Sequence, residues 1–153
     1  MISTCARRAT IEDVPEINAV LNDADARRGM SAFPEGVEWL DAGPTFGSMS
    51  YFLFLGGFVL FVPMSEQSRV WEGHVAALRG YRGENALDVA ASAVDQMFKS
   101  GDARHIIANV SERRRDLRAI MRALGFSKSS TTPGLYIKSL CDWKEDQRCL
   151  QTR

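Results

Sequence analysis

The stretch that decides the fold is Arg79-Gly80-Tyr81-Arg82-Gly83-Glu84-Asn85-Ala86-Leu87, a basic turn with two glycines. An apolar run ends just before it at Leu78, and a helical pattern continues after it from Ala86 to Phe98. A turn that opens a helix presents unpaired backbone N–H groups and the positive end of the helix dipole. Together with the arginine charges, these groups favour a phosphate-bearing ligand. The same pattern also fits an ordinary strand-to-helix connection with solvated arginines.

The composition is that of a single soluble domain. The 153 residues include 19 basic and 19 acidic side chains, so the net charge is zero and no global field attracts nucleic acid or a membrane surface. The most apolar run, Tyr51 to Val62, is shorter than the roughly 20 residues that a membrane-spanning helix needs. Three scattered cysteines and two histidines predict neither a disulfide framework nor a metal site. The N-terminus lacks a signal-peptide pattern, which predicts a cytoplasmic protein.

Hydrophobic periodicity and turn residues predict seven strands and four helices. The expected strands are Ser3–Arg8, Ser50–Leu55, Phe58–Pro63, Val70–Leu78, His105–Val110, Phe126–Ser130 and Leu135–Leu140. The expected helices are a first one capped by Thr10 and ending near Leu21, a brief one at Val37–Leu40, then Asn85–Lys99, and Glu112–Leu124 capped by Ser111. The Asn85–Lys99 helix is expected to bury Ala86, Leu87, Ala90, Ala93, Val94, Met97 and Phe98.

This order predicts an α/β fold with a mixed sheet. Three strands form an antiparallel meander, whose first turn is Gly56-Gly57. A helix then crosses to a parallel strand, as in a βαβ unit, and a two-strand hairpin closes the sheet. Residues 1–140 are expected to form one domain, and residues 141–153 a polar C-terminal tail that is partly disordered.

Three stretches, in this order, resemble the Gcn5-related N-acetyltransferase (GNAT) family over most of the chain. They are Ala6 to Ile17, similar to the family's first strand and helix; Tyr81 to Leu87, similar to its acyl-CoA loop; and Arg118 to Phe126, similar to its last helix running into Gly-Phe. The loop is also similar to that of divergent members carried by tailed bacteriophages.

The resemblance implies acetyl-CoA, or another acyl-CoA, as cosubstrate. Its pantetheine arm is expected between the strands Val70–Leu78 and His105–Val110, which splay apart in this family. Its pyrophosphate is expected on backbone N–H groups at the start of the long helix, and an N–H near Ala77 would polarise the thioester carbonyl. The implied cofactor-binding residues are Ala77, Leu78, Arg79, Arg82, Gly83, Glu84, Asn85, Ala86, Leu87 and Arg114.

The implied reaction is direct acetyl transfer to the amine of a small molecule or a protein. Glu72 and His74 share one face of their strand and are the candidates for the general base; a surface pair or a core histidine would give the same pattern. Two positions depart from the family, because Asn85 replaces a loop glycine and Met121 replaces a tyrosine that protonates the departing thiolate. The alternative is therefore a GNAT-fold binding or regulatory protein that acts through a protein partner.

Three further features bear on partners. Five arginines, Arg113, Arg114, Arg115, Arg118 and Arg122, form the strongest charge cluster of the sequence. They fit the solvated side of an amphipathic helix, and they could also hold RNA, DNA or an acidic protein. Acceptor specificity is expected in the Asn22–Gly47 segment and in the hairpin around Pro133, whereas the apolar meander and Trp143 leave room for a homodimer.

Overall fold

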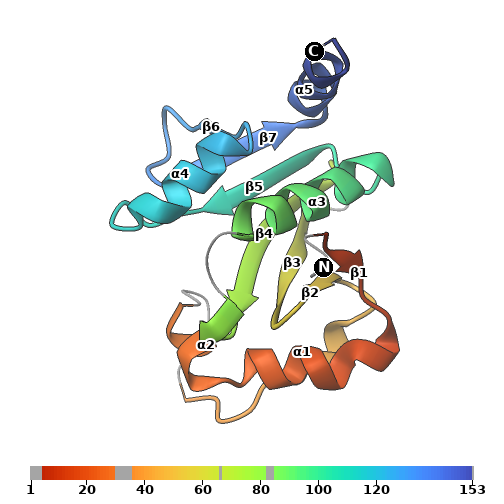
Figure 1. Cartoon of the computed structure of the whole chain (residues 1–153), viewed down its shortest axis with the longest axis vertical. Coiled ribbons are helices and arrows are strands. Elements are labelled where there is room, and N and C mark those ends of the chain that lie inside the picture. Colours follow the sequence, from red (N-terminus) through yellow and green to blue (C-terminus); the bar gives the residue numbers. More distant parts are fainter. Residues whose placement is uncertain (1–4, 30–35, 66, 82–84, 153) are drawn as a thin grey trace. The chain divides into compact units, whose positions relative to one another are not determined.

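The computed structural model describes residues 5–29, 36–65, 67–81 and 85–152. Its strands are β1 (Arg7–Arg8), β2 (Ser50–Phe54), β3 (Gly57–Ser65), β4 (Val70–Ala77), β5 (His105–Asn109), β6 (Ser127–Lys128) and β7 (Leu135–Ser139). Its α-helices are α1 (Val14–Leu21), α2 (Ala24–Gly29), α3 (Ala86–Lys99), α4 (Arg115–Ala123) and α5 (Leu140–Gln151). The strands form a mixed sheet in the order β1-β2-β3-β4-β5-β7-β6, which confirms the predicted fold class (Figure 1).

The chain divides into two compact units, each built from two separate segments. Unit 1 comprises Met1–Val62 and His74–Ala93, and unit 2 comprises Pro63–Gly73 and Val94–Arg153. The strands β3 and β4 and the helix α3 each contribute residues to both units. The single domain expected for residues 1–140 therefore stays a prediction.

Unit 1 contains the antiparallel strands β1 and β2 and the first part of β3, drawn from red to yellow in Figure 1. In the β2–β3 hairpin, Phe54 pairs with Gly57, so the turn is Leu55-Gly56 and not the predicted Gly56-Gly57. Gly56 has a φ of 73°, a left-handed conformation that glycine adopts without steric cost. The turn therefore starts one residue earlier than the sequence pattern indicated.

The helix α1 covers the core of unit 1 with the predicted apolar face. Ile17, Val20 and Leu21 are buried and pack in one cluster with Tyr51, Leu53, Phe58, Leu60 and Ala76. A short 3₁₀ turn, Ile11–Asp13, precedes the helix. The carboxylate of Asp13 accepts the backbone N–H of Thr10 at 2.8 Å, and it also pairs with both terminal nitrogens of Arg7 at 2.7 Å. Acidic capping thus links the first helix to the first strand.

The predicted helix at Val37–Leu40 is wrong, and a helix forms earlier instead. Asp23 accepts the backbone N–H groups of Asp25 and Ala26 at 3.0 and 2.9 Å, which caps α2. The backbone around Leu40 is held by side chains from α1 and the turn that follows it. Asn22 accepts the Leu40 N–H at 2.8 Å and donates to the Leu40 carbonyl at 2.7 Å. Tertiary hydrogen bonds therefore replace the intrahelical ones there.

Unit 2 contains the parallel pairing of β4 with β5 and the closing hairpin. Val70, Trp71 and Glu72 pair in parallel register with His105, Ile106 and Ile107. The strand β7 lies antiparallel to β5 and also to β6, as predicted for the hairpin. Along β5 and β7, the side chains of Ile106, Ala108 and Tyr136 are buried.

The helix α4 begins at Arg115, three residues later than predicted. The carbonyl of Ser111 accepts the Arg114 N–H at 3.0 Å, so Ser111 begins a turn and not the helix itself. At the other end, Gly125 has a φ of 78° and donates its N–H to the Arg122 carbonyl, whereas the Phe126 N–H donates to the Met121 carbonyl. This is the Schellman arrangement, which satisfies two carbonyls of the last helical turn.

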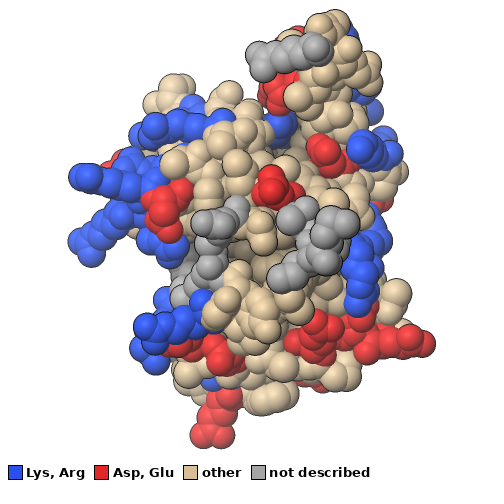
Figure 2. All heavy atoms as spheres, viewed as in Figure 1, with Lys and Arg blue, Asp and Glu red and all other residues tan. Residues whose placement is uncertain are grey.

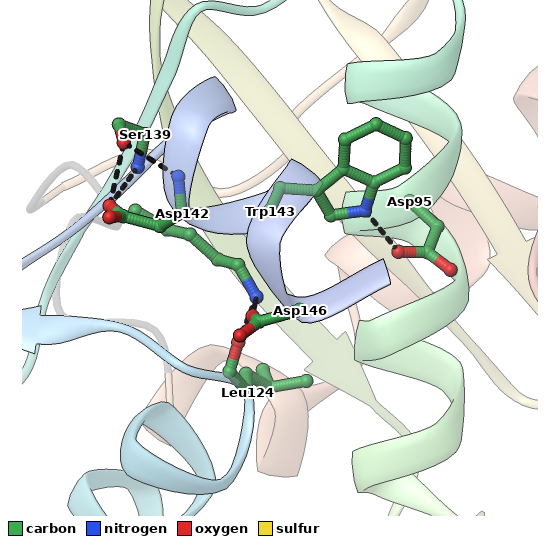
Figure 3. A network of polar contacts seen from close by, with 7 residues as sticks. Asp95, Leu124, Ser139, Asp142, Trp143 and Asp146 are labelled. Carbon is green, nitrogen blue, oxygen red and sulfur yellow. Dashed lines mark hydrogen bonds and ion pairs between the residues drawn. The ribbon is translucent and has the colours of Figure 1, made fainter. Parts of the chain in front are cut away.

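Residues 140–151 form the helix α5, so a disordered tail is wrong for this part of the chain. Ser139 caps α5, accepting the Asp142 N–H at 3.1 Å. Trp143 donates its indole N–H to Asp95 at 2.6 Å and stacks on Phe98 of α3 with the ring centroids 5.7 Å apart. Figure 3 shows the cap and the bond between Trp143 and Asp95. The sequence analysis considered Trp143 for a homodimer contact. In the structure it contacts Asp95 and Phe98 of its own unit.

A buried lysine also connects α5 to the end of α4 (Figure 3). The Lys138 side chain is only 6% exposed, and its ammonium pairs with Asp146 at 2.8 Å. The same ammonium donates to the Leu124 carbonyl at the C-terminus of α4. A cation at this position complements the negative end of the helix dipole and satisfies a terminal carbonyl.

Candidate functional site

The helix α3 begins where the basic turn predicts a ligand-binding helix N-terminus. It runs for 14 residues from Ala86, and the Asn85 carbonyl accepts the Val89 N–H at 3.0 Å, as at the start of a regular helix. The first N–H groups of an α-helix have no partner within the helix. Asn85 and Leu87 are exposed, and Ala86 is half-buried. The predicted residues Arg82, Gly83 and Glu84 lie outside the described residues.

The burial of α3 differs from the prediction at its first turn. Leu87, expected in the core, is 37% exposed, whereas Val89 is buried. Ala93, Val94, Met97 and Phe98 are buried as expected. The first turn also carries Asp88, an exposed carboxylate that was not among the predicted site residues. An acid there stabilises the helix N-terminus, but it competes with an anionic ligand for the same positive dipole end.

The segment before the helix is fixed within unit 1 by the β2–β3 turn. The N–H of Leu78 donates to the Gly56 carbonyl at 2.8 Å, and the Tyr81 N–H donates to the Leu78 carbonyl at 2.9 Å. The Tyr81 ring lies on Gly56 so closely that a Cβ at Gly56 would overlap it. Arg79 is exposed beside this turn. The Leu78 N–H is therefore engaged by the chain itself, whereas Ala77 is the last residue of β4.

Glu72 of β4 has a partner that the sequence pattern did not predict. Its carboxylate accepts a hydrogen bond from the Asn109 side-chain amide at 2.6 Å. Asn109 ends β5, two residues beyond the Ile107 that pairs with Glu72 across the parallel ladder. Because residues two apart on a strand lie on the same face, Asn109 shares the face of Ile107, the parallel partner of Glu72. An Asn at the end of a predicted strand was the available signal.

The other predicted base, His74, lies two residues beyond Glu72 on β4 and is half-buried. In the sequence, this spacing put both side chains on one face of the strand. His74 falls in unit 1 and Glu72 in unit 2. The choice of general base between them stays a prediction.

Arg114, predicted to contact the cofactor, is paired with a neighbouring carboxylate. Its Nε and Nη2 atoms donate to the two oxygens of Asp116 at 3.0 and 2.9 Å. The Arg114 guanidinium, through these hydrogen bonds, lowers the pKa of Asp116 to about 2, and Asp116 raises the pKa of Arg114 in return. The Arg114 side chain is 46% exposed, so the pair lies in solvent. Its role towards a cofactor stays a prediction.

Met121 is half-buried on α4, and its thioether offers no acidic proton. Across the residues that the structure describes, no group of three or more His, Cys, Asp or Glu side chains could hold a metal ion. Within the same ranges, no helix is both long and apolar enough to cross a lipid bilayer.

Comparison with known proteins gives the fold. No protein-family model matches the chain, and no curated protein matches it. Three solved structures illustrate the similarity. Aminoglycoside acetyltransferase AAC(6')-Ib, in complex with coenzyme A and kanamycin, is 13% identical with a TM-score of 0.70, and the match covers 94% of this chain and 98% of that one.

A mutant of the spermidine N-acetyltransferase SpeG from Vibrio cholerae is 14% identical with a TM-score of 0.71, covering 93% of this chain and 96% of that one. A GNAT-family acetyltransferase from Bacillus anthracis is 15% identical with a TM-score of 0.63, covering 88% and 93%. At these identities the similarity concerns the fold. The chain has the fold of the GNAT acetyltransferases, and the predicted resemblance is confirmed at that level.

Proposed function

We propose that this GNAT-fold protein is an acyl-CoA-dependent N-acyltransferase that transfers an acetyl group from acetyl-CoA to an amine. The observation that carries the proposal is the start of α3 at Ala86, directly after the basic turn that follows β4. The N-terminus of such a helix suits a pyrophosphate. The fold supports the same ligand, because the similar AAC(6')-Ib structure contains coenzyme A.

The cosubstrate site would use residues on both sides of this turn. Ala86 and Leu87, with Asn85, would offer backbone N–H groups to the pyrophosphate, and Arg79 and Arg82 would add positive charge. Gly83 and Glu84 are the other predicted residues of this stretch of sequence, and Arg114 would have to exchange Asp116 for a cofactor phosphate. An N–H near Ala77 and Leu78 would polarise the thioester carbonyl, although the Leu78 N–H bonds to Gly56 in this structure.

In the reaction, the amine nitrogen would attack the thioester carbonyl carbon and form the C–N bond. The C–S bond would then break, and CoA would leave as a thiolate. The amine must lose one proton, which Glu72 or His74 would accept. The hydrogen bond from Asn109 holds the Glu72 carboxylate in place. Because Met121 donates no proton, the thiolate would depart without a side-chain acid or take its proton from water.

The acceptor is an amine of a small molecule or of a protein. Among the similar structures, AAC(6')-Ib is in complex with kanamycin, and SpeG is a spermidine N-acetyltransferase. Both compounds carry several amines, which supports a small polyamine-like acceptor as the first to test. The three cysteines, Cys5, Cys141 and Cys149, are exposed and free, which supports the predicted cytoplasmic location.

Calorimetry with acetyl-CoA, followed by detection of free CoA thiol with a panel of amines, tests the proposal. We expect a Kd below about 1 mM, equivalent to roughly −4 kcal/mol. Arg82→Gln should weaken binding, whereas Glu72→Gln should leave the Kd unchanged and slow turnover. Absence of binding at millimolar acetyl-CoA would refute the proposed cosubstrate. Binding without turnover on any amine would refute the transferase and leave a CoA-binding protein.

The carboxylate of Asp88 offers a sharper test of the proposed pyrophosphate position. Removing its charge with Asp88→Asn should tighten acetyl-CoA binding by about two- to fivefold, since one charge in the first helical turn contributes about 0.3–1 kcal/mol. Glu145→Gln, an exposed change on α5, serves as the control. An equal change in both variants would place the phosphates elsewhere.

A further inference from the structure

The exposed side of α4 is a stripe of arginines that have no carboxylate partners among the residues described by the structure. Arg115, Arg118 and Arg122 follow one another at spacings of three and four residues, so they line one face of the helix. The opposite face carries Leu117, Ile120 and Met121, which are half-buried, and ends at the buried Leu124. Figure 2 shows Lys and Arg side chains gathered over α4.

Nearby acids neutralise only part of the positive charge of residues 111–124. Residues 111–124 contain five arginines and two acids, a local charge of +3 in a chain whose net charge is zero. Asp116 forms an ion pair with Arg114. Within the described part of the chain, no carboxylate pairs with the side chains of Arg115, Arg118 or Arg122.

Arg118 differs from its two neighbours in the stripe. It is half-buried, and its Nε atom is buried with no hydrogen-bond partner in the described structure. Buried donors in native proteins normally have a hydrogen-bond partner, either in the protein or in an ordered water. A guanidinium also binds carboxylate oxygens in a two-pronged geometry, which the planar group is shaped to do.

We propose that the arginine stripe Arg115–Arg118–Arg122 is a docking surface for an acidic segment of a partner protein. Charge complementarity identifies the occupant. The stripe is about 10 Å long, from the seven helical rises of about 1.5 Å between Arg115 and Arg122, which matches carboxylates spaced three to four residues apart on one helix. Such a partner can also offer basic side chains to the exposed Glu112 that lies next to the stripe.

A nucleic acid fits the same surface less well. Residues 111–124 contain no aromatic side chain on which a base could stack. The acids Glu112 and Asp116 interrupt the charge, and a chain of zero net charge has no long-range field that would draw in a phosphate backbone. A mixed acidic protein segment tolerates these acids, whereas a continuous row of phosphates is repelled by them.

The probe is a fluorescent helical peptide with glutamates at three- and four-residue spacing, measured by anisotropy on the full chain. A peptide of the same composition in scrambled order and a single-stranded oligonucleotide of equal charge are compared with it. We expect the spaced peptide to bind at least about fivefold more tightly than either comparison ligand at low salt, with affinity falling steeply as salt screens the exposed charges.

The triple variant Arg115→Gln/Arg118→Gln/Arg122→Gln should lose at least about tenfold in affinity for the spaced peptide. The control Lys99→Gln/Lys144→Gln/Arg148→Gln removes the same charge from exposed positions elsewhere in unit 2 and should change affinity by less than about twofold. Circular dichroism and thermal unfolding verify that both variants fold.

Three outcomes would overturn the proposal. Equal losses in the two variants would mean that only net charge matters. Tighter binding of the oligonucleotide would identify a nucleic-acid surface. Sedimentation that shows self-association of the wild type, lost in the stripe variant, would identify a second copy of this chain as the occupant. The peptide measurements contain no acetyl-CoA, so their outcome is independent of the proposed transferase.

Discussion

Replacing Gly125 by alanine tests how closely the Lys138–Asp146 pair packs on the end of α4. Gly125 has a φ of 78°, where an L-residue costs about 1–2 kcal/mol. A Cβ there would lie 2.8 Å from an Asp146 oxygen and 3.0 Å from the Lys138 ammonium, so the pair must move. The ammonium also bonds to the Leu124 carbonyl, so its displacement weakens two contacts.

The matched control is Gly101→Ala. Gly101 has a φ of 79° at the end of α3, but nothing lies within 4 Å of the position that a Cβ would take there. Both substitutions carry the conformational cost, reduced by about 0.4–1 kcal/mol because alanine also restricts the unfolded chain. Only Gly125→Ala disturbs the ion pair. A hydrogen bond to a charged group contributes about 1.5–3 kcal/mol, and we discount this because Asp146 is 50% exposed.

We therefore expect a loss in the free energy of unfolding of about 1 kcal/mol for Gly101→Ala and about 2–3 kcal/mol for Gly125→Ala. Urea titration followed by circular dichroism measures both. In a Lys138→Met background the excess cost at Gly125 should shrink, because the ion pair is already absent. Equal costs for the two glycines, or an unchanged excess in that background, would refute the packing argument.

Three other predictions concern contacts of single side chains. Asn22→Ala removes both hydrogen bonds to Leu40, so the Leu40 amide should exchange faster with deuterium and the free energy of unfolding should fall by about 1–3 kcal/mol; unchanged exchange would contradict the role of Asn22. Trp143→Phe keeps the stacking on Phe98 but loses the bond to Asp95, and should cost about 1 kcal/mol, whereas Trp143→Ala should cost about 2–3 kcal/mol, below the range for a core aromatic because the ring is half-buried; similar losses would show that packing contributes little. The pKa of Asp116 is lowered to about 2 by Arg114, so its stabilising effect is complete above the unfolded pKa of about 3.9 and is lost as pH falls through about 2. NMR titration should return the pKa of Asp116 close to about 3.9 in Arg114→Gln, and no change would mean that another group causes the shift.

The sequence predicted those elements whose signals are local. The apolar spacing of Ile17, Val20 and Leu21 placed α1 correctly, and Gly125 marked the end of α4. The antiparallel meander and the parallel partner of β4 followed from the order of apolar runs and turns. The helix and its end depend on residues within a few positions of one another, and the strand pairing follows from the order of the elements along the chain.

Elements fixed by distant contacts were missed or misplaced. Val37–Leu40 looked helical, but Asn22 binds the Leu40 backbone from 18 residues away. The tail beyond residue 140 looked disordered because it is polar, yet Trp143 bonds to Asp95, 48 residues earlier in the chain. One local signal was overlooked, since Ser139 and Asp142 have the spacing of a capping box.

The candidate site shows the same division. The elements on either side of it, β4 ending at Ala77 and α3 beginning at Ala86, were readable from the pattern around the basic turn, whereas the site itself stays a prediction. The sequence did not predict the hydrogen-bond partners of Glu72 and Arg114. Asn109 contacts Glu72 because of the parallel register of β4 and β5. Asp116 pairs with Arg114 two residues earlier, a spacing at which helix side chains do not normally face each other.

The interleaving of the two units has a consequence for how the protein is made on the ribosome. All segments of unit 1 precede Val94 in the chain, whereas unit 2 also needs the strands and helices from β5 onward. Unit 1 can therefore complete its core while the later part of unit 2 is still being synthesised. The residues of β3 and β4 that belong to unit 2 would then lack the neighbouring strand β5 until it is synthesised. A stalled chain ending after α3 should resist proteolysis within unit 1 and be cleaved between Pro63 and Gly73.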